Sequence, residues 1–190
     1  MGAEVAHDPA EFRRELDAQI GLPTSSQPSV APDQVNQPMI RHWVDALSDE
    51  NPIYTDQEFA ERTRFGGIVA PPTMLQIWTM GRPVIEGIAE RGGRPPVTDD
   101  RPPSPLDRAG FTGTIATNNE LEFDRYLRPG ERLVSRGVIE EISDEKKTAL
   151  GVGHFLTWVT TFRTLDGEEV GRQRFRVFKF RPGSASGEGG

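Results

Sequence analysis

The stretch from Pro72 to Met80 constrains the fold of this chain more than any other, because it is apolar on nearly every side. A helix without a polar face is stable only when other elements enclose it. Pro83 would stop or kink such a helix a few residues later. The pattern therefore predicts a buried central helix whose apolar residues are Met74, Leu75, Ile77, Trp78 and Met80.

The chain then changes to the period of two that is typical of β-strands. We predict long strands, joined by tight turns, over residues 114–123, 132–142, 148–164 and 168–180. The longest of them places a series of alternate residues on one face, namely Leu150, Val152, His154, Leu156, Trp158, Thr160 and Phe162. The first alternates in the same way through Ile115, Thr117, Asn119, Leu121 and Phe123. Such strands form an antiparallel sheet.

The first half of the chain has helix signals instead. Capping residues and apolar spacing predict a helix that begins after Asp8, a second over 37–47 and a short third that begins after Thr55. Helices followed by long antiparallel strands, with one apolar helix to enclose, describe an α+β domain. We predict the hot-dog fold, in which a curved antiparallel sheet wraps around a central helix.

Proline- and glycine-rich stretches divide the chain. We expect a single domain over 1–182, in which 1–35 form an N-terminal helix and an extended segment. Residues 91–112 are predicted to be a long irregular loop, and 183–190 a flexible tail or linker.

Composition excludes several classes of function. Lys plus Arg is 22 and Asp plus Glu is 29, and the net charge of −7 argues against partners such as nucleic acid or anionic membranes. No apolar run approaches the length of a membrane span, and no signal segment opens the chain, so we expect a cytoplasmic protein. The chain has no cysteine and only three scattered histidines, and we therefore expect no metal site.

A short motif follows the second predicted helix. It runs Asp49-Glu50-Asn51-Pro52-Ile53-Tyr54, with Ala60 downstream, and is followed by Phe65-Gly66-Gly67-Ile68-Val69-Ala70-Pro71-Pro72-Thr73. Here the chain resembles the MaoC-like enoyl-CoA hydratase/dehydratase family, whose signature is Gly-Asp-x-Asn-Pro-Leu-His. The resemblance covers about residues 35–180 and implies hydration of an enoyl-CoA thioester, which is the substrate, without a further cofactor.

The chain departs from that family at the residues that carry the chemistry. Family members use an Asp and a His five residues later as the acid–base pair, but here Asp49 is followed by Tyr54. A tyrosine has an ordinary pKa of about 10 and is a poor base at neutral pH. Pro71 and Pro72 stand where catalytic relatives have His-Gly, and proline has no N–H to donate to a thioester oxyanion. We therefore expect no catalytic residue in this chain.

Further motifs narrow the resemblance. Leu106-Asp107-Arg108-Ala109-Gly110-Phe111, Ala116-Thr117-Asn118, Arg125-Tyr126-Leu127-Arg128-Pro129-Gly130-Glu131 and the stretch from Lys146 to Phe155 look like the larger subunit of actinobacterial steroid side-chain enoyl-CoA hydratase. That resemblance implies a catalytic hot-dog partner in a heterodimer or heterotetramer. It also implies a following OB-fold domain that docks a thiolase or lyase. The acyl pocket is then expected to use the substrate-binding residues Val69, Ala70, Pro71, Trp78, Phe111 and Asn118.

Two other functions remain open from the sequence. A self-sufficient homodimeric hydratase would use Asp49 with another base, for which His154 is a candidate. A non-enzymatic acyl-CoA-binding scaffold is the second alternative.

Most of the singled-out residues also have a structural interpretation, which we favour. Asp49 is expected to cap a helix end, and Tyr54 and His154 to pack in the core. Gly151 and Gly153 permit close approach, either of the central helix, which we favour, or of an acyl chain. Arg172, Arg174 and Arg176 share one strand face, where they could hold CoA phosphates, form a solvated face or pair with glutamates.

Overall fold

The computed structural model of the chain describes residues 8–81, 84–89 and 103–182. The helical elements are α1 (Pro9–Asp17), α2 (Gln37–Leu47), η1 (Pro52–Tyr54), α3 (Gln57–Glu61), η2 (Pro72–Thr79) and α4 (Pro105–Arg108). The strands are β1 (Ser29–Val30), β2 (Gly113–Phe123), β3 (Leu133–Ile142), β4 (Lys146–Thr148), β5 (Gly151–Thr164) and β6 (Glu169–Phe180).

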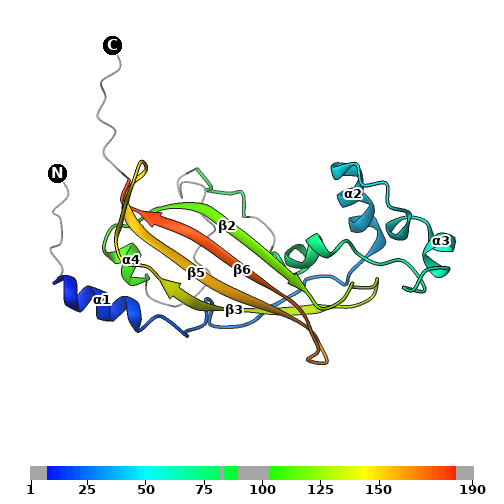
Figure 1. The fold of residues 1–190 in the computed structure, drawn as a ribbon, viewed down its shortest axis with the longest axis horizontal. Helices are drawn as coiled ribbons and strands as arrows, with labels where there is room; N and C mark the ends of the chain where they lie inside the picture. The colour runs from blue at the N-terminus through cyan, green and yellow to red at the C-terminus, as the bar shows by residue number, and fades with distance from the viewer. Residues whose placement is uncertain (1–7, 82–83, 90–102, 183–190) are drawn as a thin grey trace, which may run out of the picture.

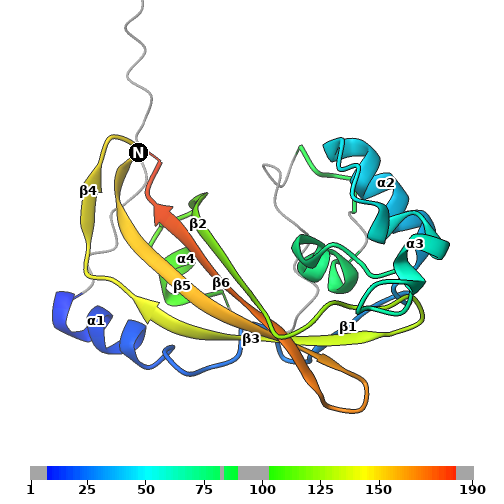
Figure 2. The ribbon, with the colours of Figure 1, turned by 45° about the vertical axis from the view of Figure 1, so that its right-hand side comes forward.

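The strands form one antiparallel sheet in the order β1-β3-β5-β6-β2, with β4 paired to the start of β5. The sheet is long and curved, with α1 and α4 at one end and α2 and α3 at the other (Figures 1 and 2). The predicted α+β hot-dog architecture is therefore confirmed. The predicted strands and the helices at 37–47 and after Thr55 are present with shifts of a few residues.

Local capping explains where the helices begin. The Asp8 side chain accepts a hydrogen bond from the N–H of Ala10 at the start of α1, and Asp56 accepts one from Phe59 at the start of α3. Asn36 does the same for α2 through the N–H of Met39 at 3.0 Å. α2 ends at Ser48, which takes the left-handed conformation with φ of 53°.

One face of the sheet, which we call the inner face, holds η2. On β5 this face carries the alternate residues from His154 to Phe162, as the sequence pattern predicts. Leu75 of η2 packs on Gly171, where a Cβ would lie 2.9 Å from its methyl group. Thr79 accepts a hydrogen bond from Ser135 of β3 at 3.0 Å, and the Gln173 amide on β6 donates to Gln76. These contacts fix η2 against β3 and β6 at one end of the sheet.

η2 occupies nearly the span predicted for the central helix, Pro72 to Met80, but differs from it in type and burial. It is a 3-10 helix of eight residues, and Met80, which follows it, is 57% exposed. Two prolines at its start remove N–H donors, and Gly81 follows its end. At about 2.0 Å per residue η2 is roughly 16 Å long, whereas the 14 residues of β5, at about 3.3 Å each, extend roughly 46 Å. η2 therefore covers about a third of the inner face.

A second hydrophobic cluster covers the other end of the same face. It buries Leu16 of α1, Leu106 of α4, Phe111 and Ile142, with Phe12, Ile139 and Leu156 packed against them. The first cluster, around η2, contains Ile53, Tyr54, Val69, Met74 and Trp78 among others. The inner face thus has two separate apolar covers with a middle section between them.

The face assignment predicted for β2 is wrong at its start. The register with β6 shifts between Ala116 and Asn118, so that Ile115 opposes Phe178 on the outer face while Leu121 opposes Gln173 on the inner face. A bulge of this kind inserts one unpaired residue and reverses the side-chain alternation beyond it. Sequence alternation alone does not locate such a bulge.

The favoured interpretation of Gly151 and Gly153 is also wrong, because the close approach is made by β6. A Cβ on Gly153 would overlap the backbone carbonyl oxygen of Lys179, and one on Gly151 would lie 2.7 Å from that of Arg181. Neither η2 nor an acyl chain is needed to explain these glycines. The predictions for Pro83, for the tail 183–190 and for most of the loop 91–112 lie outside the described residues.

We predict that Gly153→Ala lowers the free energy of unfolding by about 2–4 kcal/mol, since β5 and β6 must separate to admit the methyl group. Urea denaturation followed by tryptophan fluorescence measures the change. Gly81→Ala is the control, because a Cβ at Gly81 meets no atom within 4 Å. Equal stability of the two variants would contradict this account of Gly153.

Candidate functional site

The residues that correspond to the family's acid–base pair lie in the segment between α2 and α3. Asp49 follows the last residue of α2 and is exposed, and its carboxylate accepts a hydrogen bond from the N–H of Asn51 at 3.1 Å. Asn51 in turn caps η1 by accepting from the N–H of Ile53 at 3.3 Å. Asp49 thus bonds a backbone N–H as expected, but it closes a turn and caps no helix, since Ser48 ends α2 and Asn51 begins η1.

Tyr54, at the position of the missing histidine, is buried, with 6% of its surface exposed. Burial, followed by the nearby Tyr126 and Asp49, raises the pKa of its hydroxyl to about 12. Tyr54 is therefore a neutral core residue at physiological pH and cannot serve as a general base.

The start of η2 offers few backbone donors for an oxyanion. Pro71 and Pro72 have no N–H, the N–H of Ala70 bonds to the carbonyl of Leu127 at 2.8 Å, and that of Met74 bonds to Pro71 at 3.0 Å. At most the N–H of Thr73 remains in this stretch. A paired set of donors, which an oxyanion hole requires, is not formed here.

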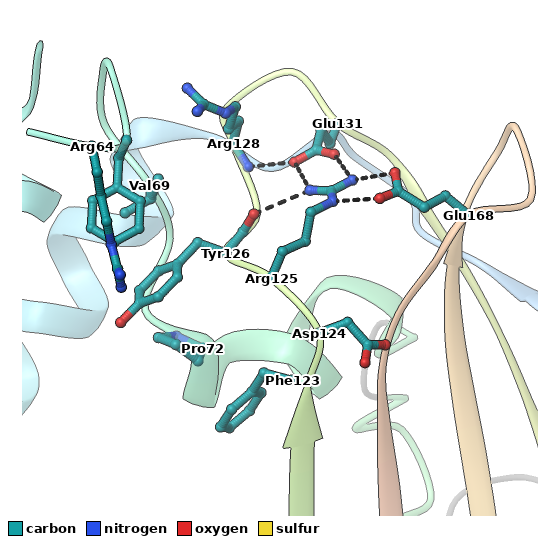
Figure 3. A pocket seen from close by; sticks show the side chains of 11 residues that line it. Arg64, Val69, Pro72, Phe123, Asp124, Arg125, Tyr126, Arg128, Glu131 and Glu168 are labelled. Atoms are coloured by element: carbon teal, nitrogen blue, oxygen red, sulfur yellow. Dashed lines mark hydrogen bonds and ion pairs between the residues drawn. The ribbon is translucent and has the colours of Figure 1, made fainter.

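A cavity of about 870 Å³ lies beside this segment (Figure 3). Its wall joins the residues after α3, the start of η2, the end of β2, the β2–β3 loop and the β5–β6 turn. It is lined by Arg64, Phe65, Val69, Pro72, Phe123, Asp124, Arg125, Tyr126, Arg128, Glu131 and Glu168. Phe65 and Tyr126 stack with ring centres 4.7 Å apart, so the cavity has an aromatic wall and a charged rim.

Arg125 organises the charged rim. Its guanidinium donates to Glu131 at 2.6 Å and to Glu168 at 2.7 and 2.8 Å, as Figure 3 shows. These bonds raise the pKa of Arg125 and lower that of Glu168. Glu131 also accepts from the backbone N–H of Arg128. The clamp thereby joins the β2–β3 loop to the β5–β6 turn.

The six residues expected to bind substrate are not brought together. Val69 lines the cavity, and Ala70 and Pro71 are buried next to it in the chain. Trp78 is buried in the first cluster, whereas Phe111 is buried in the second, against Phe12 and His154. Asn118 opposes Arg176 on the outer face, away from η2, because it alternates with the inner-facing Asn119 and Leu121.

His154 and the three arginines of β6 each contact neighbouring residues of the chain. His154 is buried and its Nδ1 lies 2.9 Å from the carbonyl oxygen of Ser143, while its Nε2 meets no partner in the described part of the chain. The arginine row takes the glutamate-pairing alternative at Arg172, which pairs with Glu169, and at Arg174, which pairs with Glu140. Arg176 instead stacks on the ring of Phe155 at 4.3 Å.

Sequence reasoning missed an aromatic pair in the middle of the inner face. Trp158 of β5 and Phe175 of β6 are paired across the strands, with ring centres 5.1 Å apart, and both are half-buried. Neither is among the buried residues of the two clusters. Their strand parity was visible in the sequence, but their position outside both apolar clusters depends on where η2 and α1 pack on the sheet. Tyr126 and Arg125 lay in a motif that carried the resemblance, without a role.

Comparison with known proteins identifies the family of the chain. Residues 18–173 match the family described as "FAS1-like, dehydratase domain region". The chain belongs to this MaoC-like dehydratase family. It is 41% identical over 174 residues, 90% of its length and 53% of the relative's, to a "Probable enoyl-CoA hydratase alpha subunit" of Thermomonospora curvata.

A second relative has a more specific name. The chain is 40% identical over 173 residues, 89% of its length and 52% of the relative's, to the "3-oxo-4,17-pregnadiene-20-carboxyl-CoA hydratase alpha subunit" of Mycobacterium tuberculosis. The chain therefore spans about half the length of the curated relatives that it matches.

Solved structures agree with the fold. The ChsH1-ChsH2 complex from Mycobacterium tuberculosis contains a chain that matches with a TM-score of 0.73 and 33% identity, over 94% of this chain and 96% of that one. The (R)-hydratase from A. caviae matches with a TM-score of 0.52 at 14% identity, over 80% and 94% of the two chains, and shows the fold alone.

The described residues contain neither a metal-ligand cluster nor a membrane-spanning helix. No group of three or more His, Cys, Asp or Glu residues within 8–81, 84–89 and 103–182 could hold a metal ion. Among the same residues, no helix has the length and apolar character to cross a membrane.

We predict that Arg125→Ala lowers Tm at pH 7 by roughly 2–4 °C, the size expected for losing one favourable ion-pair cluster in a domain of this length. Because the folded pKa of Glu168 is lowered, the clamp contributes fully above the ordinary glutamate pKa and is lost as the pH falls through the lowered value. The Tm difference between wild type and variant should therefore shrink below about pH 4. Thermal scans over this pH range test it, with Arg172→Ala, outside the cavity, as the control.

Proposed function

We propose that this chain is the non-catalytic, pocket-forming subunit of a heteromeric enoyl-CoA hydratase, and that a second hot-dog chain supplies the acid–base residues. The reaction adds water across the double bond of a 2-enoyl-CoA thioester. The observation that carries the proposal is the state of the acid–base site, where Asp49 caps a backbone turn and Tyr54 is a buried neutral phenol. The names of the relatives, both alpha subunits of hydratases, support the same role.

An exposed sheet edge supports the presence of a partner. β2 is the last strand in the sheet, and nearly all of its residues are exposed, including Ile115 at 45% and Phe123 at 43%. A long edge strand with exposed apolar side chains is prone to pair with another strand. A hot-dog partner that pairs with β2 would extend the sheet and cover these side chains, and the similar chain in the ChsH1-ChsH2 structure also belongs to a complex.

The middle of the inner face supports a bulky apolar acyl group. η2 leaves the Trp158–Phe175 pair outside both apolar clusters, and two adjacent aromatic rings provide a flat surface for a fused-ring group. The unpaired indole N–H of Trp78, in the cluster around η2, would be available as a donor to a ligand oxygen. The name of the pregnadiene-carboxyl-CoA hydratase subunit fits a steroid side chain as the acyl group.

A self-sufficient hydratase is disfavoured by distance within the fold. His154, its candidate base, packs against Phe12 of α1 and against Phe111 in the second cluster. Asp49 lies between α2 and α3, at the opposite end of the sheet (Figure 1). Within one chain the two side chains therefore cannot act on one substrate atom.

The test is reconstitution with a catalytic MaoC-like chain. We predict no hydration of an enoyl-CoA by this chain alone and turnover by the complex, and Asp49→Asn in this chain should change kcat of the complex less than twofold. Absorbance of the conjugated thioester follows the reaction. Turnover by the isolated chain that Asp49→Asn abolishes would overturn the proposal.

Tyr54→His tests whether the missing histidine alone accounts for the lack of activity that we predict for the isolated chain. We predict that this substitution does not give the isolated chain measurable activity, because acid–base and oxyanion groups act as a unit and the prolines at the start of η2 still lack N–H donors. Hydration by the isolated variant would show that the start of η2 does not limit the site.

For the acyl surface, we predict that Trp158→Ala with Phe175→Ala lowers kcat/KM of the complex about tenfold or more for an enoyl-CoA with a fused-ring acyl group, the effect of losing about one buried aromatic contact. A short linear enoyl-CoA should lose less than threefold. Leu165→Ala, an exposed residue in the β5–β6 turn, is the control. An equal loss for both substrates would contradict the assignment of this surface.

A further inference from the structure

The two edges of the sheet differ in how their backbone groups are used. The edge formed by β3 is covered by β1 and by the segment 21–31. There the N–H of Gly21 donates to the carbonyl of Ile139 and that of Ala31 to the carbonyl of Leu133, both at 2.8 Å. β2, at the other edge, pairs only with β6 among the described residues, and most of its side chains are exposed (Figure 1). This part of the chain therefore has one open edge that can accept a strand of another chain.

A bulge divides the open edge. Thr117 is the extra residue of β2 between Ala116 and Asn118, and its hydroxyl donates to the carbonyl of Arg176 at 3.1 Å. Residues 118–123 beyond it pair with β6 without a further shift. A partner strand can therefore form its longest regular ladder with these six residues.

The outer face of this run carries two carboxylates without a bonded cation. Glu120 and Glu122 are exposed, and they oppose Arg174 and Arg172 on β6. Both guanidinium groups are bonded to other glutamates of the sheet. The pKa of Arg174 is accordingly raised first by Glu140 and only last by the two glutamates of β2. No ion pair among the described residues involves either of these two carboxylates, so the open edge is acidic.

A second copy of this chain does not match that charge. β2 has no Lys or Arg, so pairing two copies of β2 supplies no cation to Glu120 or Glu122 in any register. If the strands pair about a twofold axis centred on Leu121, Glu120 of each copy opposes Glu122 of the other, and like charges directly opposite are destabilising. A register that continues across both bulges would set Glu120 against the exposed Ile115 of the other copy. Self-pairing therefore leaves both glutamates unpaired or opposed to like charge.

We propose that Glu120 and Glu122 select the strand that pairs with β2. They attract the edge strand of a different hot-dog chain that carries Lys or Arg at two alternate positions of its outer face, and they repel a second copy of this chain. The exposed Ile115 and Phe123 offer apolar contact to either strand, so the charges decide between the two. The inference rests on the proposed function in taking a second hot-dog chain as the partner.

The affinity of the complex tests the attraction. Glu120→Gln with Glu122→Gln should raise the Kd for the catalytic MaoC-like chain about fivefold, the effect of two lost cross-strand charge pairs. Lysine at both positions should raise it about thirtyfold or more, because the pairs become repulsive. The Kd of the wild type should also rise with NaCl more steeply than that of the glutamine variant. Glu145→Lys, an exposed residue between β3 and β4, is the control and should leave the Kd unchanged. Wild-type affinity in the double lysine variant would overturn the proposal.

Self-association of the isolated chain tests the repulsion. Glu120→Lys alone makes the register centred on Leu121 complementary, because the new ammonium opposes Glu122 of the other copy twice. Sedimentation equilibrium should therefore show more dimer for this single variant than for the wild type. Lysine at both positions restores like charges and should return the chain to the wild-type distribution. Equal self-association of the wild type, the single variant and the double variant would contradict a role of these glutamates in rejecting a second copy.

The two measurements also separate this inference from its main alternative and from the proposed function. If the glutamates only keep an open edge soluble, the glutamine variant will self-associate more but bind the catalytic chain as tightly as the wild type, and partner selection is overturned. If the wild type forms no complex with a catalytic MaoC-like chain, the proposed function fails. The self-association of the isolated variants then still decides whether Glu120 and Glu122 repel a second copy.

Discussion

The packing of η2 on the inner face of the sheet is the contact on which the rest of the structure depends. Met74, Leu75 and Trp78 are almost fully buried there, and Gly171 gives Leu75 the room to reach the backbone of β6. Burial of three large apolar side chains contributes several kcal/mol, about 1.5–3 kcal/mol each by general transfer values. The same contact positions the start of η2 beside Tyr54 and the cavity. The packing of the core therefore also sets the geometry of the candidate site.

The short length of η2 has consequences at both of its ends. Two prolines at its start remove the N–H groups that would stabilise an oxyanion, and its end near Met80 leaves the middle of the inner face to Trp158 and Phe175. In the proposed function, the same element therefore both lacks oxyanion donors and leaves the Trp158–Phe175 pair to an acyl group.

The charged residues follow a simple division. On the outer face Arg172 and Arg174 pair with glutamates of the same sheet and keep it solvated, whereas Arg125 ties two loops together at the cavity rim. Exposed pairs of this kind contribute little to stability individually. Arg64 and Arg128, at the same cavity, differ from both groups because no carboxylate among the described residues pairs with either of them.

The sequence by itself determined the fold class, the order of helices and strands along the chain, the helix start at Asp8, the start of the third helix to within one residue of Thr55, and the replacement of the acid–base histidine by Tyr54. These follow from local rules, since periodicity, caps and residue chemistry are properties of neighbouring residues. Only the tertiary structure decided the bulge that places Ile115 on the outer face, the separation of Trp78 from Phe111, the strand contact at Gly153 and the grouping of Arg64, Tyr126 and Arg128 around one cavity. Each of these depends on register or on contacts between residues far apart in the chain, which no local pattern encodes.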